Sequence, residues 1–282
     1  MSLFLELKIV GGLGNQLFQY AAGRSLSIKN KIPYLLLNTE SYKTDPFGRK
    51  FGLTNFRIKG AVIKNEMLRK AFRKGTKINR FISGSPLYHT IEEDGLKLQP
   101  IADKTRFVTS LSGYWQSDFY FSDIHPILLE ELVPLDLPAL PELLNKKNTV
   151  AVHIRRSDYL GDNRFGALGE KYYHDAIETA KKRIENPFFI FFSDDIDWCK
   201  DKFKGENIFF CDYKDWDKDY LQLYLMSKCS HQIIANSSFS WWGAWLNNNA
   251  GKIVIRPERP FVDQSLMYES YYPKEWISIS NL

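Results

Sequence analysis

Apolar residues gather along the chain in short continuous runs that have the length of β-strands. Because these runs do not alternate with polar residues, we expect both faces of each strand to be covered, as in parallel sheets. Helical patterns separate the runs, and the best one spans residues 169–186. The runs are 7–11, 34–37, 149–154, 188–193, 207–212, 232–236 and 252–256, and the apolar stripe of the helix is 173, 176, 177, 180 and 184. The pattern predicts an α/β protein made of parallel βαβ units.

A proline-rich stretch divides this pattern into two parts. Residues 134–148 contain three prolines followed by polar residues, directly before the run that begins at 149. Such a composition is typical of a linker. We therefore expect two domains, residues 1–140 and residues 141–282. At 282 residues and 44% hydrophobic content, the chain can form a core in each of them.

Charge and cysteine content exclude several functional classes. The 38 basic and 33 acidic residues leave a net charge of +5 that is scattered along the chain, so we expect no nucleic-acid partner. Cys199, Cys211 and Cys229 lack metal-ligand spacing and lie in or beside apolar runs. They are expected to be buried reduced thiols, which form neither disulfides nor a zinc site.

The sequence also allows a prediction of where in the cell the protein lies. It contains no window of about 18 uncharged apolar residues and no basic leader, which predicts a cytoplasmic protein. A basic cluster at 69–80, with Lys70, Arg73 and Lys74, is the candidate for peripheral contact with the inner face of an anionic membrane.

The first apolar run leads into a glycine-rich turn, VGGLGNQLFQYAAG. Gly12 and Gly14 fit the first two positions of the dinucleotide-binding pattern G-x-G-x-x-G, but Leu17 occupies the third. The acidic residue expected about 20 residues further on is matched only loosely, so a nicotinamide dehydrogenase is disfavoured. The other interpretations are a tight structural turn, or a helix N-terminus where Asn15 and Gln16 meet an anion or a sugar hydroxyl.

The run at 149–154 continues into HIRRSD, which concentrates charge at the end of a strand. His153, Arg155, Arg156 and Asp158 thus lie where open α/β sheets bind ligands. A planar guanidinium can bind a pyrophosphate through two N–H groups. Successive side chains on a strand alternate between its faces, so the two arginines cannot both point at one ligand. We expect one of them to form a salt bridge with Asp158.

The run at 188–193 also ends in polar residues. Asp194 and Asp195 follow Ser193 at the strand end, where a carboxylate can accept two N–H groups from guanine or bind a ribose hydroxyl. D-x-D pairs, the metal signature of many sugar transferases, begin at 195, 215 and 217. Solvated surface charge also produces such pairs, so we favour the arginines over a metal ion as the groups that neutralise a diphosphate.

A third strand end, within IIANSSFSWWGAWL, carries serines. Ser237, Ser238 and Ser240 offer hydroxyl and N–H donors at the start of a helix, and we expect one of them to cap it. The three tryptophans of this string can stack on a sugar or a base, although core packing better explains at least two of them.

Taken together and in this order, GGLGNQLFQYA, HIRRSDY, FSDDIDWC and NSSFSWWGAWL resemble the α1,2-fucosyltransferases of glycosyltransferase family 11, over about residues 8–250. The string H-x-R-R-x-D alone is shared with α1,6- and protein O-fucosyltransferases, whereas the first and last strings indicate the narrower family. Ser157 departs from the family, where glycine is usual, and restricts the geometry of this turn.

The resemblance implies a GT-B architecture, in which two Rossmann-like domains face a central cleft. The N-terminal domain, 1–140, is then on the acceptor side, and the C-terminal domain, 141–282, binds GDP-fucose. The resemblance further implies an inverting galactoside 2-α-L-fucosyltransferase that needs neither metal nor cofactor. Such an enzyme moves L-fucose from GDP-β-L-fucose to the 2-hydroxyl of a terminal galactose, so the partners are GDP-fucose and a β-galactoside glycan.

Each candidate residue acquires a role from this reaction. Arg155 is expected to stabilise the charge that develops on the leaving diphosphate, and Arg156 to support the motif or form the salt bridge. Asp158 is the candidate base. The residues expected to bind the donor are His153 at the base or ribose, Asp195 or alternatively Asp194 at guanine, Ser237 and Ser238 at the pyrophosphate, and Gly12, Gly14, Asn15 and Gln16 at the N-terminal lip.

The residues alone also allow two other functions. One is a metal-dependent glycosyltransferase that uses a D-x-D pair, for which inhibition by EDTA would be evidence. The other is a nucleotide-sugar-binding protein without turnover, which would bind GDP but never release it from GDP-fucose.

Overall fold

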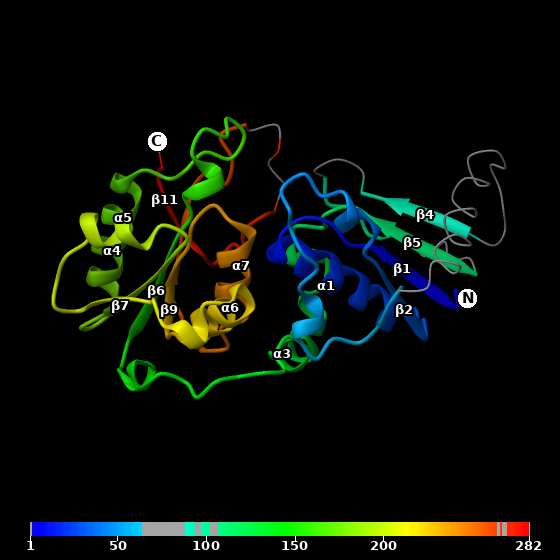
Figure 1. Ribbon diagram of the computed structural model, residues 1–282, viewed down its shortest axis with the longest axis horizontal. Helices are drawn as coiled ribbons and strands as arrows, with labels where there is room; N and C mark the ends of the chain where they lie inside the picture. Colours follow the sequence, from blue (N-terminus) through cyan, green and yellow to red (C-terminus); the bar gives the residue numbers. More distant parts are fainter. Residues whose placement is uncertain are drawn as a thin grey trace. The chain divides into compact units, whose positions relative to one another are not determined.

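The computed structural model describes residues 2–63, 88–93, 97–101, 107–263, 266 and 270–281. These residues form two compact units (Figure 1). The first contains the described residues up to Val133 together with Ser270 and Tyr271, and the second contains the rest. The division lies between Val133 and Pro134, at the start of the proline-rich stretch 134–148. The boundary predicted from the sequence was at residue 140, within the same stretch. The predicted separation of acceptor-side and donor-side functions stays a prediction.

The first unit is built on a five-stranded sheet with the order β3-β2-β1-β5-β4, in which all neighbouring strands are parallel. Its strands are β1 (Phe4–Lys8), β2 (Tyr34–Asn38), β3 (Ala61–Val62), β4 (Tyr88–Glu92) and β5 (Val108–Ser112). Its described helices are α1 (Leu13–Lys29) and α3 (His125–Glu131), with short 3-10 turns at Glu40–Lys43, Leu53–Asn55, Asp118–Tyr120 and Ser122–Ile124.

Helix α1 is fixed on two sides. On the sheet side, a Cβ atom at Gly23 would lie 2.2 Å from Cδ2 of Leu7 in β1, so only glycine fits there. On the other side, Glu131 of α3 accepts a hydrogen bond from the Tyr20 hydroxyl at 2.5 Å and pairs with Nη2 of Arg24 at 2.8 Å. These contacts hold the glycine-rich turn that precedes α1.

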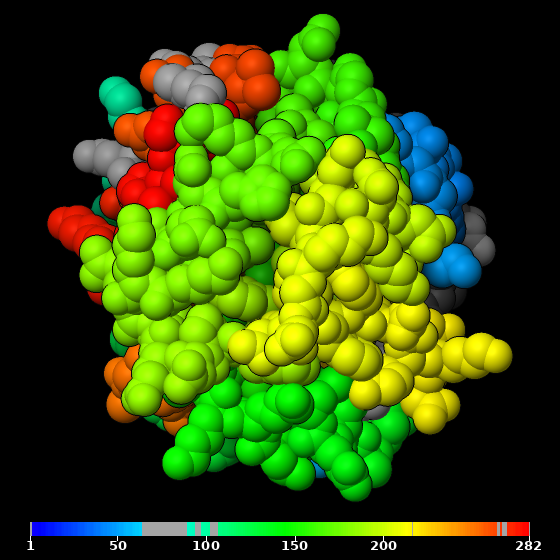
Figure 2. Space-filling view, turned by 90° about the vertical axis from the view of Figure 1, so that its left-hand side faces the viewer, coloured from blue at the N-terminus to red at the C-terminus, as the bar shows by residue number. Residues whose placement is uncertain are grey.

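The second unit is built on a six-stranded parallel sheet with the order β11-β10-β9-β6-β7-β8, the strand order of a Rossmann sheet. Its strands are β6 (Thr149–Ile154), β7 (Phe188–Ser193), β8 (Ile208–Phe210), β9 (His231–Ile233), β10 (Val254–Pro257) and β11 (Ile277–Ile279). Its helices are α4 (Glu170–Arg183), α5 (Ile196–Lys202), α6 (Asp219–Lys228) and α7 (Ser238–Trp245), and its 3-10 turns are Glu142–Asn145, Ser157–Tyr159 and Lys214–Trp216. The middle of the face seen in Figure 2 is formed by the stretch from α4 to the segment after β8, in yellow-green and yellow.

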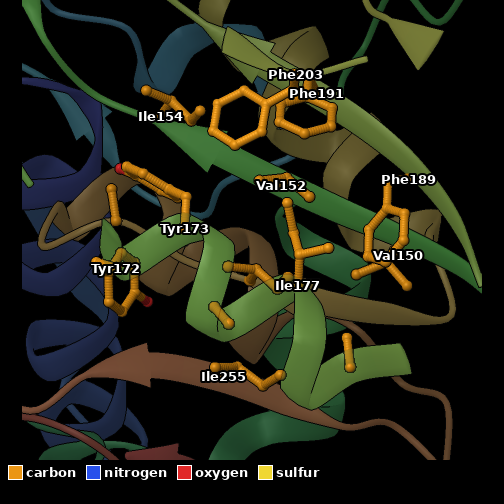
Figure 3. Close-up of a cluster of buried hydrophobic side chains, with 14 of the residues drawn as sticks. Val150, Val152, Ile154, Tyr172, Tyr173, Ile177, Phe189, Phe191, Phe203 and Ile255 are labelled. Carbon is orange, nitrogen blue, oxygen red and sulfur yellow. The ribbon is translucent and has the colours of Figure 1, made fainter. Parts of the chain in front are cut away.

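Helix α4 covers the centre of the second sheet (Figure 3). Its apolar stripe is buried as predicted and packs in one cluster with side chains of β6 and β7. The cluster includes Val150, Val152, Ile154, Tyr172, Tyr173, Ala176, Ile177, Ala180, Ile184, Phe189 and Phe191. Burial of each large apolar side chain contributes about 1.5–3 kcal/mol. This packing fixes β6 and β7, and with them the points at which their polar ends emerge.

The tryptophans of α7 belong to the core. Trp241 and Trp242 are fully buried, and the ring of Trp245 stacks on that of Trp241 with centroids 5.9 Å apart. Packing, as predicted for at least two of them, accounts for all three. The three cysteines are buried and unpaired, also as predicted.

Within the described part of the chain, no helix is long and apolar enough to cross a bilayer. Lys70, Arg73 and Lys74, the predicted membrane contact, lie outside the described residues.

Candidate active site

The polar strand ends singled out in the sequence meet at one place in the second unit. The strand order reverses between β6 and β9, and ligands of open α/β sheets bind outside the carboxyl ends of the strands at such a switch point. Arg155 follows β6, and Asp194 follows β7, the neighbour of β6. The His153 ring lies 5.4 Å from the Phe239 ring of α7, which follows β9. All three motifs therefore border the switch point.

The guanidinium of Arg155 is held by two carboxylates. Its Nε and Nη2 atoms each lie 2.8 Å from Oδ1 of Asp158, and its Nη1 lies 3.2 Å from Oδ2 of Asp194. The Nε–H group donates a hydrogen bond to Asp158, whereas the two Nη atoms are in ion-pair contact with the two carboxylates. The side chain is 34% exposed, so a ligand can reach it.

Asp194 organises the turn that carries the arginines. Its Oδ1 accepts the backbone N–H of Arg156 at 2.9 Å, and its Oδ2 accepts that of Ser157 at 3.1 Å. Ser157, where the family usually has glycine, does not adopt a positive φ. The departure from the family pattern therefore causes no backbone strain at this turn.

Arg156 makes a separate set of contacts. Its Nε donates to Oδ2 of Asp195 at 3.1 Å, and its guanidinium lies 4.0 Å from the ring centre of Trp198. The other carboxylate oxygen of Asp195 accepts the backbone N–H of Trp198 and caps α5. The predicted salt bridge with Asp158 thus belongs to Arg155, whereas Arg156 packs into the structure. The prediction that Asp195 or Asp194 holds guanine stays a prediction.

His153 is neutral at physiological pH. Burial, together with the positive charge of Arg155, lowers the pKa of His153 to about 3. Its Nδ1 atom is buried without a hydrogen-bond partner among the described residues. A neutral imidazole in this position can form hydrogen bonds with a base or a ribose, but it cannot supply a positive charge.

The turn between β9 and α7 uses most of its side chains internally. Ser237 caps α7 by accepting the Phe239 N–H at 3.3 Å, the capping predicted for one of the serines, and Ser238 begins the helix. The buried amide of Asn236 donates to the carbonyls of Phe165 at 2.9 Å and Gly166 at 3.0 Å. Asn236 thus ties this turn to the loop after the arginines. In the sequence, only the position of Asn236 at the end of an apolar run indicated that it could connect these two segments.

In the first unit, the glycine-rich turn also lies at a carboxyl edge of the sheet. Gly11 has a φ of +80°, which favours glycine, and Gly12 caps α1. The fully buried amide of Gln16 donates to the carbonyls of Gly11 at 3.1 Å and Lys50 at 2.9 Å, while its oxygen accepts the Gly52 N–H at 2.8 Å.

The side chains of Gln16 and Asn15 thus both form hydrogen bonds within the protein. The oxygen of the Asn15 amide accepts one from the amide of Gln116 at 2.8 Å. The groups that the turn can offer a ligand are the main-chain N–H groups around Gly12 and Gly14, and the predicted contact of this turn with the donor stays a prediction.

No group of three or more His, Cys, Asp or Glu side chains is arranged to hold a metal ion among the described residues. Asp195, the first member of a D-x-D pair, is engaged by Arg156 and by the cap of α5. The carboxylate oxygens of Asp195 therefore already bind the guanidinium of Arg156 and the backbone N–H of Trp198.

The chain matches the family described as glycosyl transferase family 11 over residues 2–280. It belongs to this family. It is 34% identical to an alpha-1,2-colitosyltransferase of Escherichia coli, over 96% of this chain and 97% of the relative. It is 26% identical to galactoside alpha-(1,2)-fucosyltransferase 1 of Bos taurus, over 96% of this chain and 74% of the relative.

The fold matches a solved structure of a mutant of Arabidopsis thaliana FUT1 in complex with GDP. The TM-score is 0.53 at 10% identity, and the match covers 92% of this chain and 72% of the other. At this identity the likeness shows the fold alone. The predicted GT-B class is confirmed, and the protein is a glycosyltransferase of family 11.

Proposed function

We propose that this protein is an inverting, metal-independent α1,2-fucosyltransferase. It transfers L-fucose from GDP-β-L-fucose to the 2-hydroxyl of a terminal galactose in a glycan. The observation that supports the proposal is the guanidinium of Arg155, which Asp158 and Asp194 hold at the switch point while the side chain stays 34% exposed. The family relatives named as galactoside fucosyltransferases support the choice of sugar and acceptor.

Arg155 acts on the leaving group. O2 of galactose attacks C1 of fucose on the face opposite the diphosphate, the C1–O bond breaks, and its electron pair stays on the β-phosphate oxygen. The negative charge on that oxygen grows towards the transition state, so a fixed guanidinium stabilises the transition state more than the bound substrate. A guanidinium already oriented by two carboxylates needs little reorganisation to do so.

Asp158 has two tasks in this proposal. Its Oδ1 orients Arg155, and its Oδ2 accepts the proton that leaves O2 of galactose. The side chain is 42% exposed, so a hydroxyl can reach it. Little help from a base is needed if the bond to the diphosphate breaks well before the new bond forms.

The remaining donor contacts are assigned around the same strand ends. Neutral His153 lies at the base or ribose, Asp195 or alternatively Asp194 lies at guanine, and the N–H groups and hydroxyls of Ser237 and Ser238 lie at the pyrophosphate. For Asp195 to bind guanine, its Oδ2 has to be shared with Arg156.

A second candidate donor is GDP-colitose. It is favoured by the 34% identity to the E. coli relative named as an alpha-1,2-colitosyltransferase. Colitose is fucose without the 3-hydroxyl, so the two donors present the same leaving group to Arg155. They differ only at one sugar hydroxyl.

The test measures GDP release from GDP-fucose with lactose as acceptor, in the presence of EDTA. GDP-colitose and GDP-mannose are the alternative donors. We expect release that lactose stimulates, that EDTA does not inhibit, and that GDP-mannose does not support. Loss of activity in EDTA would favour the metal-dependent reaction. Binding of GDP without release from any donor would favour a binding protein, and faster release from GDP-colitose would assign the second donor.

A further inference from the structure

Asn236 joins two segments of the second unit that both border the candidate active site, and the reaction described above gives it no role. Val152 of β6 and Ile233 of β9 are paired in register, so Arg155 and Asn236, each three residues further on, leave neighbouring strands at the same level. The side chain of Asn236 is buried, with the residue only 2% exposed. Asn236 therefore starts from the position next to Arg155 at the edge of the sheet.

The amide of Asn236 is oriented by the loop that follows the arginines. Its Nδ2 donates to the carbonyls of Phe165 at 2.9 Å and Gly166 at 3.0 Å, whereas its Oδ1 is buried without a hydrogen-bond partner among the described residues. Because an unpaired buried carbonyl oxygen is costly, the two accepting carbonyls must set the orientation of this amide. Asn236 thus fixes the far end of the loop that begins at Arg155.

Phe165 extends this restraint to the guanidinium of Arg155. Its ring stacks on that of Tyr159, with centroids 5.5 Å apart and planes at 21°. The ring centre of Tyr159 lies 5.8 Å from the guanidinium carbon of Arg155, within the range of a cation–π contact. Tyr159 also shares the short turn Ser157–Tyr159 with Asp158, the carboxylate that binds Arg155. A displacement of Phe165 would therefore move two groups that contact this guanidinium.

We propose that Asn236 is a positioning residue for Arg155, acting through Phe165 and Tyr159. The inference rests on the proposed function, in which Arg155 stabilises the charge on the leaving diphosphate. Misplacement of a reacting group by about 1 Å can lower a rate about 100-fold, so the support of this side chain matters as much as its presence. Ser237 follows Asn236 directly and caps α7. Asn236 thereby also connects Arg155 to the turn that is assigned to the pyrophosphate.

The experiment measures hydrolysis of GDP-fucose without acceptor in the wild type, Asn236→Ala, Phe165→Leu and the double variant. We expect kcat to fall about tenfold in each single variant with little change in the KM for GDP-fucose, because a misplaced guanidinium weakens the transition state more than the bound donor. The double variant should lose no more than the more affected single variant, since both changes break the same chain of contacts.

The matched control is Asn249→Ala, which removes another asparagine whose Nδ2 donates to a main-chain carbonyl, that of Ser230. This variant should keep the kcat of the wild type. Thermal unfolding checks that every variant is folded, and Phe165→Leu tests the same contacts with the amide of Asn236 left in place.

NMR of the arginine side chains gives a readout that does not depend on turnover. The Nε–H signal of Arg155, identified by its absence from Arg155→Ala, should shift in Asn236→Ala and Phe165→Leu but not in Asn249→Ala. An unchanged signal or an unchanged kcat in Asn236→Ala would overturn the inference, as would losses of kcat that add in the double variant, and the transferase would remain. A wild type that neither transfers nor hydrolyses would instead contradict the proposed function, and with it this inference.

Discussion

The two parallel sheets bring different chemistry to the same structural position. At the carboxyl edge of the second sheet, arginines and aspartates pair through side chains, as in the contacts of Arg155 with Asp158 and Asp194. At the carboxyl edge of the first sheet, polar side chains bind main-chain groups, as Gln16 and Tyr42 do, and aromatic rings are exposed.

The same edge of a parallel sheet is thus built from paired charges in one unit and from contacts between side chains and main chain in the other. A fixed guanidinium suits a diphosphate that gains charge during the reaction. The predictions below alter one edge at a time.

The largest effect is expected from Arg155→Ala. Loss of the principal charge stabiliser should lower turnover about 100- to 1000-fold, or about 3–4 kcal/mol, in transfer and hydrolysis alike. The matched control is Arg183→Ala, at the exposed end of α4, which should leave both activities unchanged. Steady-state GDP release tests both, with thermal unfolding as a check on folding. Retention of more than about a tenth of the activity in Arg155→Ala would refute the assignment.

Asp158→Asn separates the two tasks of that residue. The amide can still accept a hydrogen bond from Arg155 but cannot take a proton, so transfer to lactose should fall about 100-fold. Hydrolysis of GDP-fucose without acceptor should fall much less. The ratio of transfer to hydrolysis is the readout. A parallel loss of both activities would mean that Asp158 only positions Arg155.

Gln16→Ala tests the amide that joins the glycine-rich turn to residues 50–52. It removes the partners of the Lys50 carbonyl and the Gly52 N–H group, whereas the Gly11 carbonyl keeps the Tyr42 hydroxyl. The free energy of unfolding should therefore fall by about 1–3 kcal/mol. Because the glycine-rich turn is a predicted donor contact, hydrolysis of GDP-fucose and transfer should fall together. Chemical denaturation and steady-state GDP release measure the two effects, and unchanged hydrolysis would count against a donor contact at this turn.

The smallest effect concerns His153 and pH. Its pKa is lowered to about 3 in the folded state, so the unfolded chain takes up a proton below about pH 6.5 while the folded protein does not. Stability is therefore lost as the pH falls, and His153 should account for about 1.4 kcal/mol between pH 7.5 and 5.5. Denaturation of the wild type and His153→Asn at both pH values measures this. An equal pH dependence in the two proteins would contradict the buried neutral state.

The strand runs and the helical stripe of α4 could be predicted because their signal is local. Continuous apolar runs and a 3.6-residue period depend only on which faces are buried. The strand ends were also readable, since charge directly after an apolar run marks a sheet edge. Arg155, Asp194 and Ser237 were found in this way.

The partners of these side chains could not be predicted, because they depend on contacts between distant segments. Nothing local indicates that Asp194 holds the turn after Arg155, or that Gln16 reaches residues 50–52.

The chain visits the first unit twice. Ser270 and Tyr271 follow β10 in the chain but belong to the first unit. The Ser270 carbonyl accepts a hydrogen bond from the Ser117 hydroxyl at 2.9 Å, and the Tyr271 ring lies beside that of Phe18. The chain then continues into β11, which pairs with β10 in the second sheet. Neither unit is therefore one continuous segment of the chain. An exchange of the first unit between relatives has to move residues 1–133 together with the short segment that ends at Tyr271, because that segment packs with this unit.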